Sequence, residues 1–271
     1  MAWPAAALCY THVPRYAVPA ADRLGWYMWP ALVWVAVVTA APAPPPPTAL
    51  TSLGVLVGTT TVEGADAFLG VRYAEPPLGR LRFKPSRRLR TPWHSPRLAT
   101  EFGDGCVEFG GGNQTSEDCL TLSVWRPHRA TTSAEDDNDG DEPLLPVLYW
   151  IHGGSMIVGS VSDPSMDGAK LALRSNVVVV SVNYRLGPLG FFSHPDLAKE
   201  EDSPGSGGLN GIHDQIVGLE YVRDEIRAFG GDPNRVTIFG ESAVRYSRFT
   251  ADCMLHTADC STRSSKFELV R

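Results

Sequence analysis

The stretch "RVTIFGESA", residues 235–243, joins a short apolar run directly to a serine with small neighbours. A Gly-x-Ser turn between a buried strand and a helix holds its serine in strained backbone geometry and lifts the hydroxyl above the sheet edge. Gly240 stands two residues before Ser242, and Ala243 follows it. The stretch therefore predicts a buried strand that ends in a reactive serine.

Upstream of this stretch, continuous apolar runs alternate with helical patterns. The runs "LPVLYWI" (145–151) and "NVVVVSVNY" (176–184) are typical of strands buried on both faces of a parallel sheet. A short helix is expected over 167–174, and a longer one over 212–229 with apolar residues spaced by threes and fours along one face. Gly230 and the glycine after it end this helix.

The earlier part of the chain has a different pattern. Residues 53–62, 68–73 and 119–126 are rich in β-branched residues and separated by turn residues, which predicts antiparallel strands. The expected fold class is α/β, with a mixed, mostly parallel sheet that follows antiparallel N-terminal strands.

Composition and charge limit the classes of molecule that the protein is expected to bind. The chain has 271 residues, 43% of them hydrophobic, and a net charge of -6. Without a clustered basic face, this charge argues against nucleic acid or an anionic membrane as the main partner, and favours a small neutral or cationic molecule or another protein. The acidic run 134–142 does not follow EF-hand spacing. We therefore expect no metal and no cofactor.

The N-terminus carries an apolar run, residues 24–41, preceded by Arg15 and Arg23. We interpret residues 1–41 as a secretory signal peptide, which predicts a secreted or extracellular protein. The alternative is a signal-anchor that keeps the chain on a membrane of the secretory pathway, although the run is shorter than the roughly 20 residues of a spanning helix and contains Pro30.

Two boundaries follow from this interpretation. Met28 is an alternative start to Met1, and residues 42–49, which include "PAPPPPT", form a stiff Pro-rich spacer.

Cys106 and Cys119 bracket a short polar loop that suits a disulfide in an oxidising compartment, the alternative being two free buried thiols. The same loop carries Asn113 in a glycosylation triplet.

A second glycine-rich turn strengthens the hypothesis of a reactive serine. "WIHGGSMIVGS", residues 150–160, places His-Gly-Gly at the end of an earlier strand, where backbone N–H groups can converge on a developing oxyanion. Alone, the motif is an ordinary tight turn after a strand. Upstream of a serine turn, it indicates acyl-transfer chemistry.

With these motifs in order, the chain resembles the N-terminal half of a type-B carboxylesterase, the cholinesterase-like branch of the α/β-hydrolase fold. The resemblance runs from about Leu53 to Ala243 and is carried by "FLGVRYAEPPLGRLRFKP", "SEDCLTLSVWRP", "LPVLYWIHGGS", "VVVVSVNYRLGPLGFFS" and "GLNGIHDQIVGLEYVRDEIRAFGGDPNRVTIFGESA". It implies a carboxylic ester hydrolase that works through an acyl-enzyme, with a domain over 50–243 and a divergent tail over 244–271.

The resemblance also implies residue roles. Ser242 corresponds to the nucleophile and Glu241 to the acid beside it that lines the substrate gorge, and the oxyanion donors would be the backbone N–H groups of Gly154, Ser155 and Ala243. His152 would position the oxyanion turn. The resemblance further implies a first disulfide and two buried structural ion pairs, respectively Cys106–Cys119, Arg82–Glu117 and Arg185–Asp214. His213 is expected at the surface.

Two departures from the family pattern favour an alternative function. Ser155 replaces the third glycine of the oxyanion turn, as in neuroligin-like adhesion proteins, and the β-branched Val244 stands where the serine turn needs a glycine. The alternative is therefore a non-catalytic, cholinesterase-like interaction protein with a protein partner. The loop between Cys106 and Cys119 also lacks a tryptophan for a quaternary ammonium, so a general carboxylic ester is a better expected substrate than a choline ester.

The third departure concerns the catalytic triad. In this fold the acid and the histidine follow the serine from distant strands and loops. After Ser242 the acidic residues and histidines of the chain are Asp252, His256, Asp259 and Glu268, all within about 30 residues of the serine. We therefore expect a fold truncated after the serine strand, without the triad acid and histidine, and inactive as this chain. We also expect that strand to be an apolar sheet edge, because the tail shows no strand or helix period.

Overall fold

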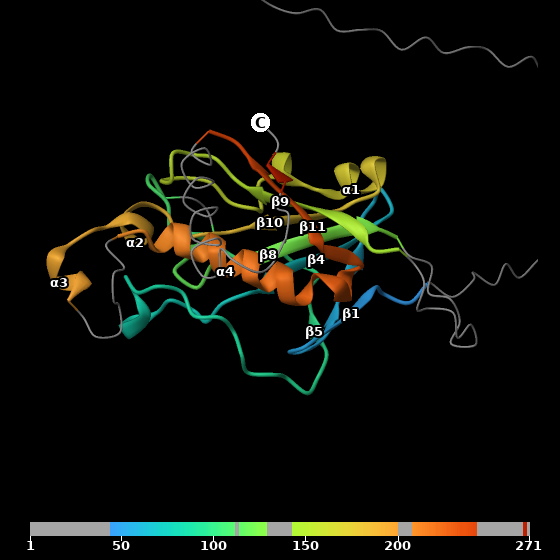
Figure 1. Ribbon diagram of the computed structural model, residues 1–271, viewed down its shortest axis with the longest axis horizontal. Helices are drawn as coiled ribbons and strands as arrows, with labels where there is room; N and C mark the ends of the chain where they lie inside the picture. The colour runs from blue at the N-terminus through green and yellow to red at the C-terminus, as the bar shows by residue number, and fades with distance from the viewer. Residues whose placement is uncertain (1–43, 112–113, 129–142, 200–207, 243–267, 270–271) are drawn as a thin grey trace, which may run out of the picture. The chain divides into compact units, whose positions relative to one another are not determined.

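A mixed sheet organises the part of the chain that the computed structural model describes, which is residues 44–111, 114–128, 143–199, 208–242 and 268–269 (Figure 1). The strand order is β12-β11-β9-β10-β8-β4-β3. The bounds are β3 (Thr59–Thr60), β4 (Ala65–Arg72), β8 (Thr121–Pro127), β9 (Leu145–Ile151), β10 (Val178–Val182), β11 (Gly231–Gly240) and β12 (Glu268–Leu269).

The sheet is parallel at one side and antiparallel at the other. β9 pairs in parallel with both β10 and β11, whereas β8 pairs antiparallel with β10 and β4. The predicted α/β class with antiparallel N-terminal strands is therefore confirmed. Two small sheets accompany it: β1 (Thr48–Thr51), β2 (Gly54–Val57) and β5 (Arg97–Leu98) form one, and β6 (Gly105–Cys106) and β7 (Thr115–Ser116) the other.

The expected strand over 53–62 is divided between two sheets. β2 belongs to the small sheet and β3 to the main sheet, with Gly58 between them. The N–H of Gly58 donates to the carbonyl of Pro47 at 2.8 Å, and a Cβ at Gly58 would lie 2.4 Å from the carbonyl oxygen of Ala67. A close backbone approach, which only glycine allows, thus breaks the strand in two.

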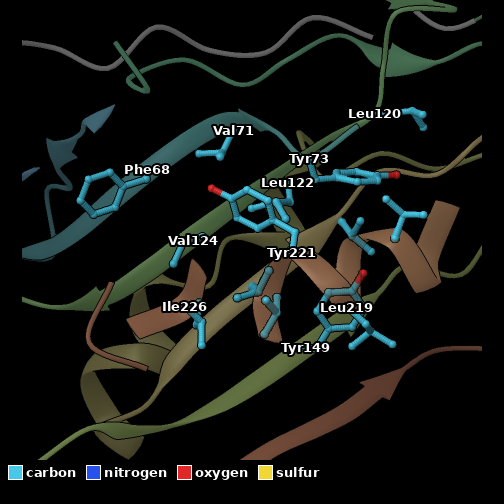
Figure 2. Close-up of a cluster of buried hydrophobic side chains, with 14 of the residues drawn as sticks. Phe68, Val71, Tyr73, Leu120, Leu122, Val124, Tyr149, Leu219, Tyr221 and Ile226 are labelled. Atoms are coloured by element: carbon cyan, nitrogen blue, oxygen red, sulfur yellow. The ribbon is translucent and has the colours of Figure 1, made fainter. Parts of the chain in front are cut away.

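Helices cover the two faces of the sheet. α4 (Asn210–Glu225), continued by the 3-10 helix η3 (Ile226–Phe229), packs on the face where Phe68, Leu122, Val124 and Tyr149 form the larger core (Figure 2). α1 (Ala169–Ser175) packs on the other face against Trp125. The remaining helices are η1 (Gly79–Leu81), η2 (Pro164–Met166), α2 (Gly187–Phe191) and α3 (Pro195–Ala198).

Burial on both faces holds for only one of the predicted parallel strands. All five residues of β10 are buried, since α1 and α4 cover it from opposite sides. On β9 and β11, however, Leu148, Trp150 and Phe239 are half-buried. Within the described residues, the prediction of two covered faces is therefore wrong for these strands, because α1 packs over β4, β8 and β10.

The long helix is buried on more than the one predicted face. Besides its apolar residues, α4 buries Asn210, Asp214 and Glu225, each of which has a partner outside the helix. The Asn210 amide donates to the carbonyl of Phe83 at 2.9 Å, and Glu225 accepts the N–H of Ser52 at 2.8 Å. Polar residues that a helical pattern assigns to solvent thus anchor the loops that cover the helix.

Arg185 and Asp214 form the central polar contact of the fold. The guanidinium donates to both carboxylate oxygens at 2.8 and 2.7 Å, and the backbone N–H of Arg185 adds a third bond at 3.0 Å. Both side chains are buried, and Arg185 also donates to the carbonyl of Lys84 at 2.8 Å. The pair links the segment after β10 to α4 and to the loop at Lys84.

The other expected ion pair is not buried. Arg82 donates to Glu117 through two bonds of 2.5 and 2.6 Å, but the two side chains are 46% and 24% exposed. Solvent screens a pair in this position, so it contributes little to stability. The expectation that Arg82 and Glu117 are buried is therefore wrong, because both residues lie in surface loops.

The expected segment boundaries also shift. Pro47 and Ala49 are buried and β1 begins at Thr48, so the end of the predicted spacer belongs to the fold.

In the tail, β12 pairs in parallel with β11, placing Glu268 opposite Thr237 and Leu269 opposite Ile238. The expectation that the tail forms no strand is wrong for these two residues. Among the described residues, none of the helices combines the length and the hydrophobicity that a membrane span requires.

We predict that Asp214→Ala lowers the free energy of unfolding by about 3–5 kcal/mol, because it leaves the buried Arg185 cation without its partner. Arg82→Ala is expected to have a much smaller effect, since that pair is exposed. Urea denaturation of the oxidised protein measures both. Equal losses in the two variants would contradict this ranking.

Candidate active site

The register between β9 and β11 determines where the two predicted turns meet. Ile151, the last residue of β9, lies opposite Gly240, the last residue of β11. The His152 turn and the Ser242 turn therefore leave the sheet at the same edge. A Cβ at Gly153 would lie only 3.1 Å from the carbonyl oxygen of Glu241, which shows how closely the two backbones approach.

Ser242 lies in the geometry that the sequence predicts for a reactive serine. Its φ is 54°, in the left-handed region that side chains other than glycine rarely adopt, and the residue is exposed. Such strain is concentrated at functional sites. Glu241 beside it is also exposed. Ala243 and Val244 lie outside the described residues, as do Asp252, His256 and Asp259.

Gly154 is required at its position by two constraints. Its φ is 101°, and a Cβ there would lie 2.1 Å from the carbonyl oxygen of Val158. The Gly154 carbonyl accepts the N–H groups of Ile157 at 3.0 Å and Val158 at 3.1 Å, which closes the turn. No acceptor within the described residues takes the N–H of Gly154 or of Ser155.

The two residues after Gly154 carry strain that sequence reasoning did not find. Ser155 has a φ of 53° and Met156 a φ of 63°. The carbonyl of Met156 accepts the N–H of Gly187 at 2.7 Å, which anchors the turn to the start of α2. A glycine at 155 would have signalled this conformation, but a serine there gives no signal.

The buried side chain of His152 packs against the turn that begins at Gly153. Its ring is buried and stacks on Tyr184, with ring centroids 4.5 Å apart, and the Tyr184 hydroxyl donates to the His152 carbonyl at 2.9 Å. The Nδ1 atom lies 2.9 Å from the carbonyl oxygen of Gly153. Burial lowers the pKa of His152, while the bond to Gly153 and the charge of Glu108 oppose this shift. A neutral imidazole under the turn suits a positioning role.

The loop between the two cysteines lies against the turn at 153–159. Cys106 and Cys119 are joined by a disulfide. Glu108 accepts the N–H of Gly159 at 2.9 Å, and the N–H of Phe109 donates to the carbonyl of Ile157 at 2.9 Å. Nothing in the sequence pattern pointed to these contacts, because the partners are about fifty residues apart. The glycosylation candidate Asn113 lies outside the described residues.

His213 is not the surface residue that we expected. It is half-buried on α4, and its Nδ1 lies 3.0 Å from the hydroxyl of Ser86. Burial lowers its pKa, and the nearby Arg185 cation acts in the same direction, whereas Asp214 and Glu220 oppose the shift. The expectation of a surface position is wrong because the loop at Ser86 covers this part of the helix.

The described residues offer no cluster of three or more His, Cys, Asp or Glu side chains that could hold a metal ion. These residues do offer an exposed, strained serine beside a turn in which two backbone N–H groups have no acceptor among the described residues. Such an arrangement can attack an acyl carbon and stabilise the oxyanion that results.

Comparison with known proteins matches this geometry to a family. Residues 45–243 match the profile of the carboxylesterase family. Curated relatives include fumonisin B1 esterase from Sphingopyxis macrogoltabida (41% identity, 67% of this chain, 33% of the relative) and acetylcholinesterase from Gallus gallus (43%, 66% and 23%). Para-nitrobenzyl esterase from Bacillus subtilis strain 168 is 39% identical over 71% of this chain and 37% of its own length.

Solved structures show the same likeness. A PNB esterase structure superposes with a TM-score of 0.63 at 39% identity, over 74% of this chain and 39% of the other. A Geobacillus stearothermophilus carboxylesterase gives a TM-score of 0.64 at 37% identity, with the same coverage of 74% and 39%. This chain therefore spans 23–39% of the length of these relatives and structures.

We predict that Gly154→Ala lowers the free energy of unfolding by more than about 2 kcal/mol, because the new Cβ would clash with the carbonyl of Val158 at a positive φ. Ser155→Gly is expected to be neutral or to stabilise by up to about 1 kcal/mol, since glycine adopts this φ without strain. Urea unfolding compares them. A destabilised Ser155→Gly would show that the serine side chain, and not the strain, matters there.

A second prediction concerns pH. The folded-state pKa values of His152 and His213 are lowered, so the unfolded chain takes up protons first as the pH falls below about 6.5. Stability contributed by the neutral rings is full above that pH and declines below it, until the folded-state pKa is reached. His213→Asn should therefore flatten the loss of stability between pH 7 and 5 relative to the parent chain. Identical slopes in the two proteins would exclude this explanation.

Proposed function

Because this chain belongs to the carboxylesterase family, we propose that residues 45–243 form the part of a carboxylic ester hydrolase that carries the nucleophile and the oxyanion hole. One observation carries the proposal: Ser242, at a φ of 54°, leaves β11 beside the Gly153–Gly154 turn that leaves β9. The strained Ser242 and the Gly153–Gly154 turn are thus neighbours, as acyl transfer requires.

The proposed reaction begins at Ser242. Its Oγ forms a bond to the acyl carbon of the ester, and the carbonyl oxygen becomes an oxyanion that accepts bonds from the N–H groups of Gly154, Ser155 and Ala243. When the tetrahedral intermediate collapses, the bond from the acyl carbon to the alcohol oxygen breaks, the alcohol leaves with the proton that the Ser242 hydroxyl gave up, and an acyl-serine remains. Water then adds to the acyl carbon, which releases the carboxylic acid and returns a proton to Ser242. The carboxylate of Glu241 beside the serine favours neutral or cationic esters over anionic ones.

Acyl transfer from an ester to a serine also needs a positioned general base. His152 is buried and stacked under the turn, whereas Ser242 is exposed, so we propose that His152 positions the turn and does not take the proton. Loss of one triad member costs about 10⁴-fold in rate. We therefore propose that these 271 residues alone hydrolyse esters at most very slowly.

A non-catalytic interaction role is the second candidate. Ser155 favours it, because this residue puts a side chain at the oxyanion turn, and Val244 favours it, because the serine turn needs a small residue there. Under this proposal the partner is a protein and Ser242 is a structural remnant. The two proposals differ in whether Ser242 reacts.

We also propose that the chain enters the secretory pathway. The expected signal peptide or signal-anchor over 1–41 lies outside the described residues. The Cys106–Cys119 disulfide supports the proposal, because such bonds persist in oxidising compartments. The location is then extracellular or, for an uncleaved segment, on a membrane of that pathway.

A fluorophosphonate probe and p-nitrophenyl acetate test the function of the purified chain. We expect slow labelling at Ser242, located by mass spectrometry of the peptide and absent in Ser242→Ala, together with ester hydrolysis about 10⁴-fold below that of a complete serine esterase. Ser162→Ala, at an exposed serine outside the site, is the matched control.

No labelling at Ser242, or equal labelling in Ser242→Ala, would refute the nucleophile and favour the interaction role. Fast hydrolysis that depends on Ser242 would support the nucleophile and refute the claim that this chain lacks a base.

A further inference from the structure

The turn at 153–159 is strained at two of its residues. Ser155 and Met156 have φ values of 53° and 63°, whereas Gly154 and Gly159 have φ values of 101° and 119°, which glycine adopts without strain. Backbone in these regions persists only where its surroundings over-determine it. The turn therefore depends on contacts from outside its own sequence, and these contacts determine where its N–H donors point.

The disulfide loop, which is the segment closed by the Cys106–Cys119 bond, supplies several of these contacts. The Glu108 carboxylate accepts the N–H of Gly159 at 2.9 Å, and Phe109 donates its N–H to the carbonyl of Ile157 at 2.9 Å. A Cβ at Gly105 would lie 3.1 Å from the Ser160 hydroxyl, so the two segments stay in close contact along their length. Among the loop residues that make these contacts, Glu108 acts through its side chain, whereas Phe109 acts through its backbone N–H.

The contact made by Glu108 continues to the residues under the turn. Gly159 approaches His152 so closely that a Cβ there would lie 2.5 Å from the Nδ1 atom. The same Nδ1 lies 2.9 Å from the carbonyl oxygen of Gly153. A chain of contacts thus leads from Glu108 through Gly159 and His152 to the residue that precedes Gly154.

We propose that Glu108 is a positioning residue, whose carboxylate holds the 153–159 turn in the conformation that presents the N–H groups of Gly154 and Ser155. This inference rests on the proposed function for its catalytic meaning, but the contact itself is independent of catalysis. A hydrogen bond to an ionised carboxylate is about twice as strong as a neutral one, which suits a bond that must hold strained backbone.

The disulfide has a part in this arrangement. Cys106 lies two residues before Glu108 and is bonded to Cys119, which directly precedes the segment that enters β8. The bond therefore closes the loop that carries Glu108 onto the central sheet. Through Glu108, this loop supports a turn that is about fifty residues away in sequence.

Amide hydrogen exchange of the intact, oxidised chain tests the proposal without any need for activity. Glu108→Ala should speed exchange at Gly159 and its neighbours in the turn by roughly tenfold or more, the effect of losing one charge-assisted hydrogen bond. Glu108→Gln keeps an acceptor oxygen and should stay within about threefold of the parent. Glu101→Ala removes an exposed carboxylate just before the loop and is the matched control.

Exchange in α4 and β10 serves as the internal reference. If it rises together with exchange in the turn, Glu108→Ala has loosened the whole fold, and the specific role of Glu108 is refuted. Unchanged exchange at Gly159 in Glu108→Ala would also overturn the proposal. If Glu108→Gln behaves like the alanine variant, the hydrogen bond is not what holds the turn, and the proposal fails.

Labelling of Ser242 by the fluorophosphonate probe supplies a second readout. We expect the rate to fall about tenfold in Glu108→Ala and to recover in Glu108→Gln. If the parent chain is not labelled at all, the proposed function fails while the exchange experiment still decides the role of Glu108. If labelling is normal in Glu108→Ala although the turn exchanges faster, Glu108 does not position the oxyanion donors.

Discussion

The parallel register of β9 and β11 is the constraint on which the site depends. Because Ile151 lies opposite Gly240, the glycine turn and the serine turn emerge side by side from the same sheet edge. A slip of one residue would turn the side chains of β11 to the opposite face and exchange buried Ile238 for half-buried Phe239. The core that α4 covers therefore maintains the register, and the register in turn maintains the site.

Strain at this edge is balanced by ordinary contacts around it. Ser242, Ser155 and Met156 all adopt positive φ without being glycine, which costs of order 1–3 kcal/mol each. Opposing this cost are the stacking of His152 on Tyr184, the bond from Gly187 to Met156, and the contacts of the disulfide loop with residues 157–160. The chemistry of the site is thus carried by backbone atoms, whose positions depend on side chains that never meet a substrate.

Several features of the fold could be predicted because they have local causes. β9 coincides with its apolar run, and the longer helix ends where Gly230 adopts a φ of 79°. Other expectations failed because they depended on distant neighbours. His213 is half-buried because the loop at Ser86 packs on it, Arg82 is exposed although its ion pair forms, and Leu148 and Trp150 are half-buried because α1 packs elsewhere. No pattern within a segment records which loop will cover it.

By itself, the sequence determined the fold class, the order of strands and helices, and the two turns that hold the proposed nucleophile and oxyanion donors, since periodicity and glycine placement are local properties of the backbone. Only the tertiary structure decided that Ser155 and Met156 are strained, that Glu108 reaches Gly159, and that the Arg82–Glu117 pair is exposed while the expected Arg185–Asp214 pair is buried. The physical reason is that burial, strain and hydrogen-bond partners depend on residues that are far apart along the chain and become neighbours only when the sheet is assembled.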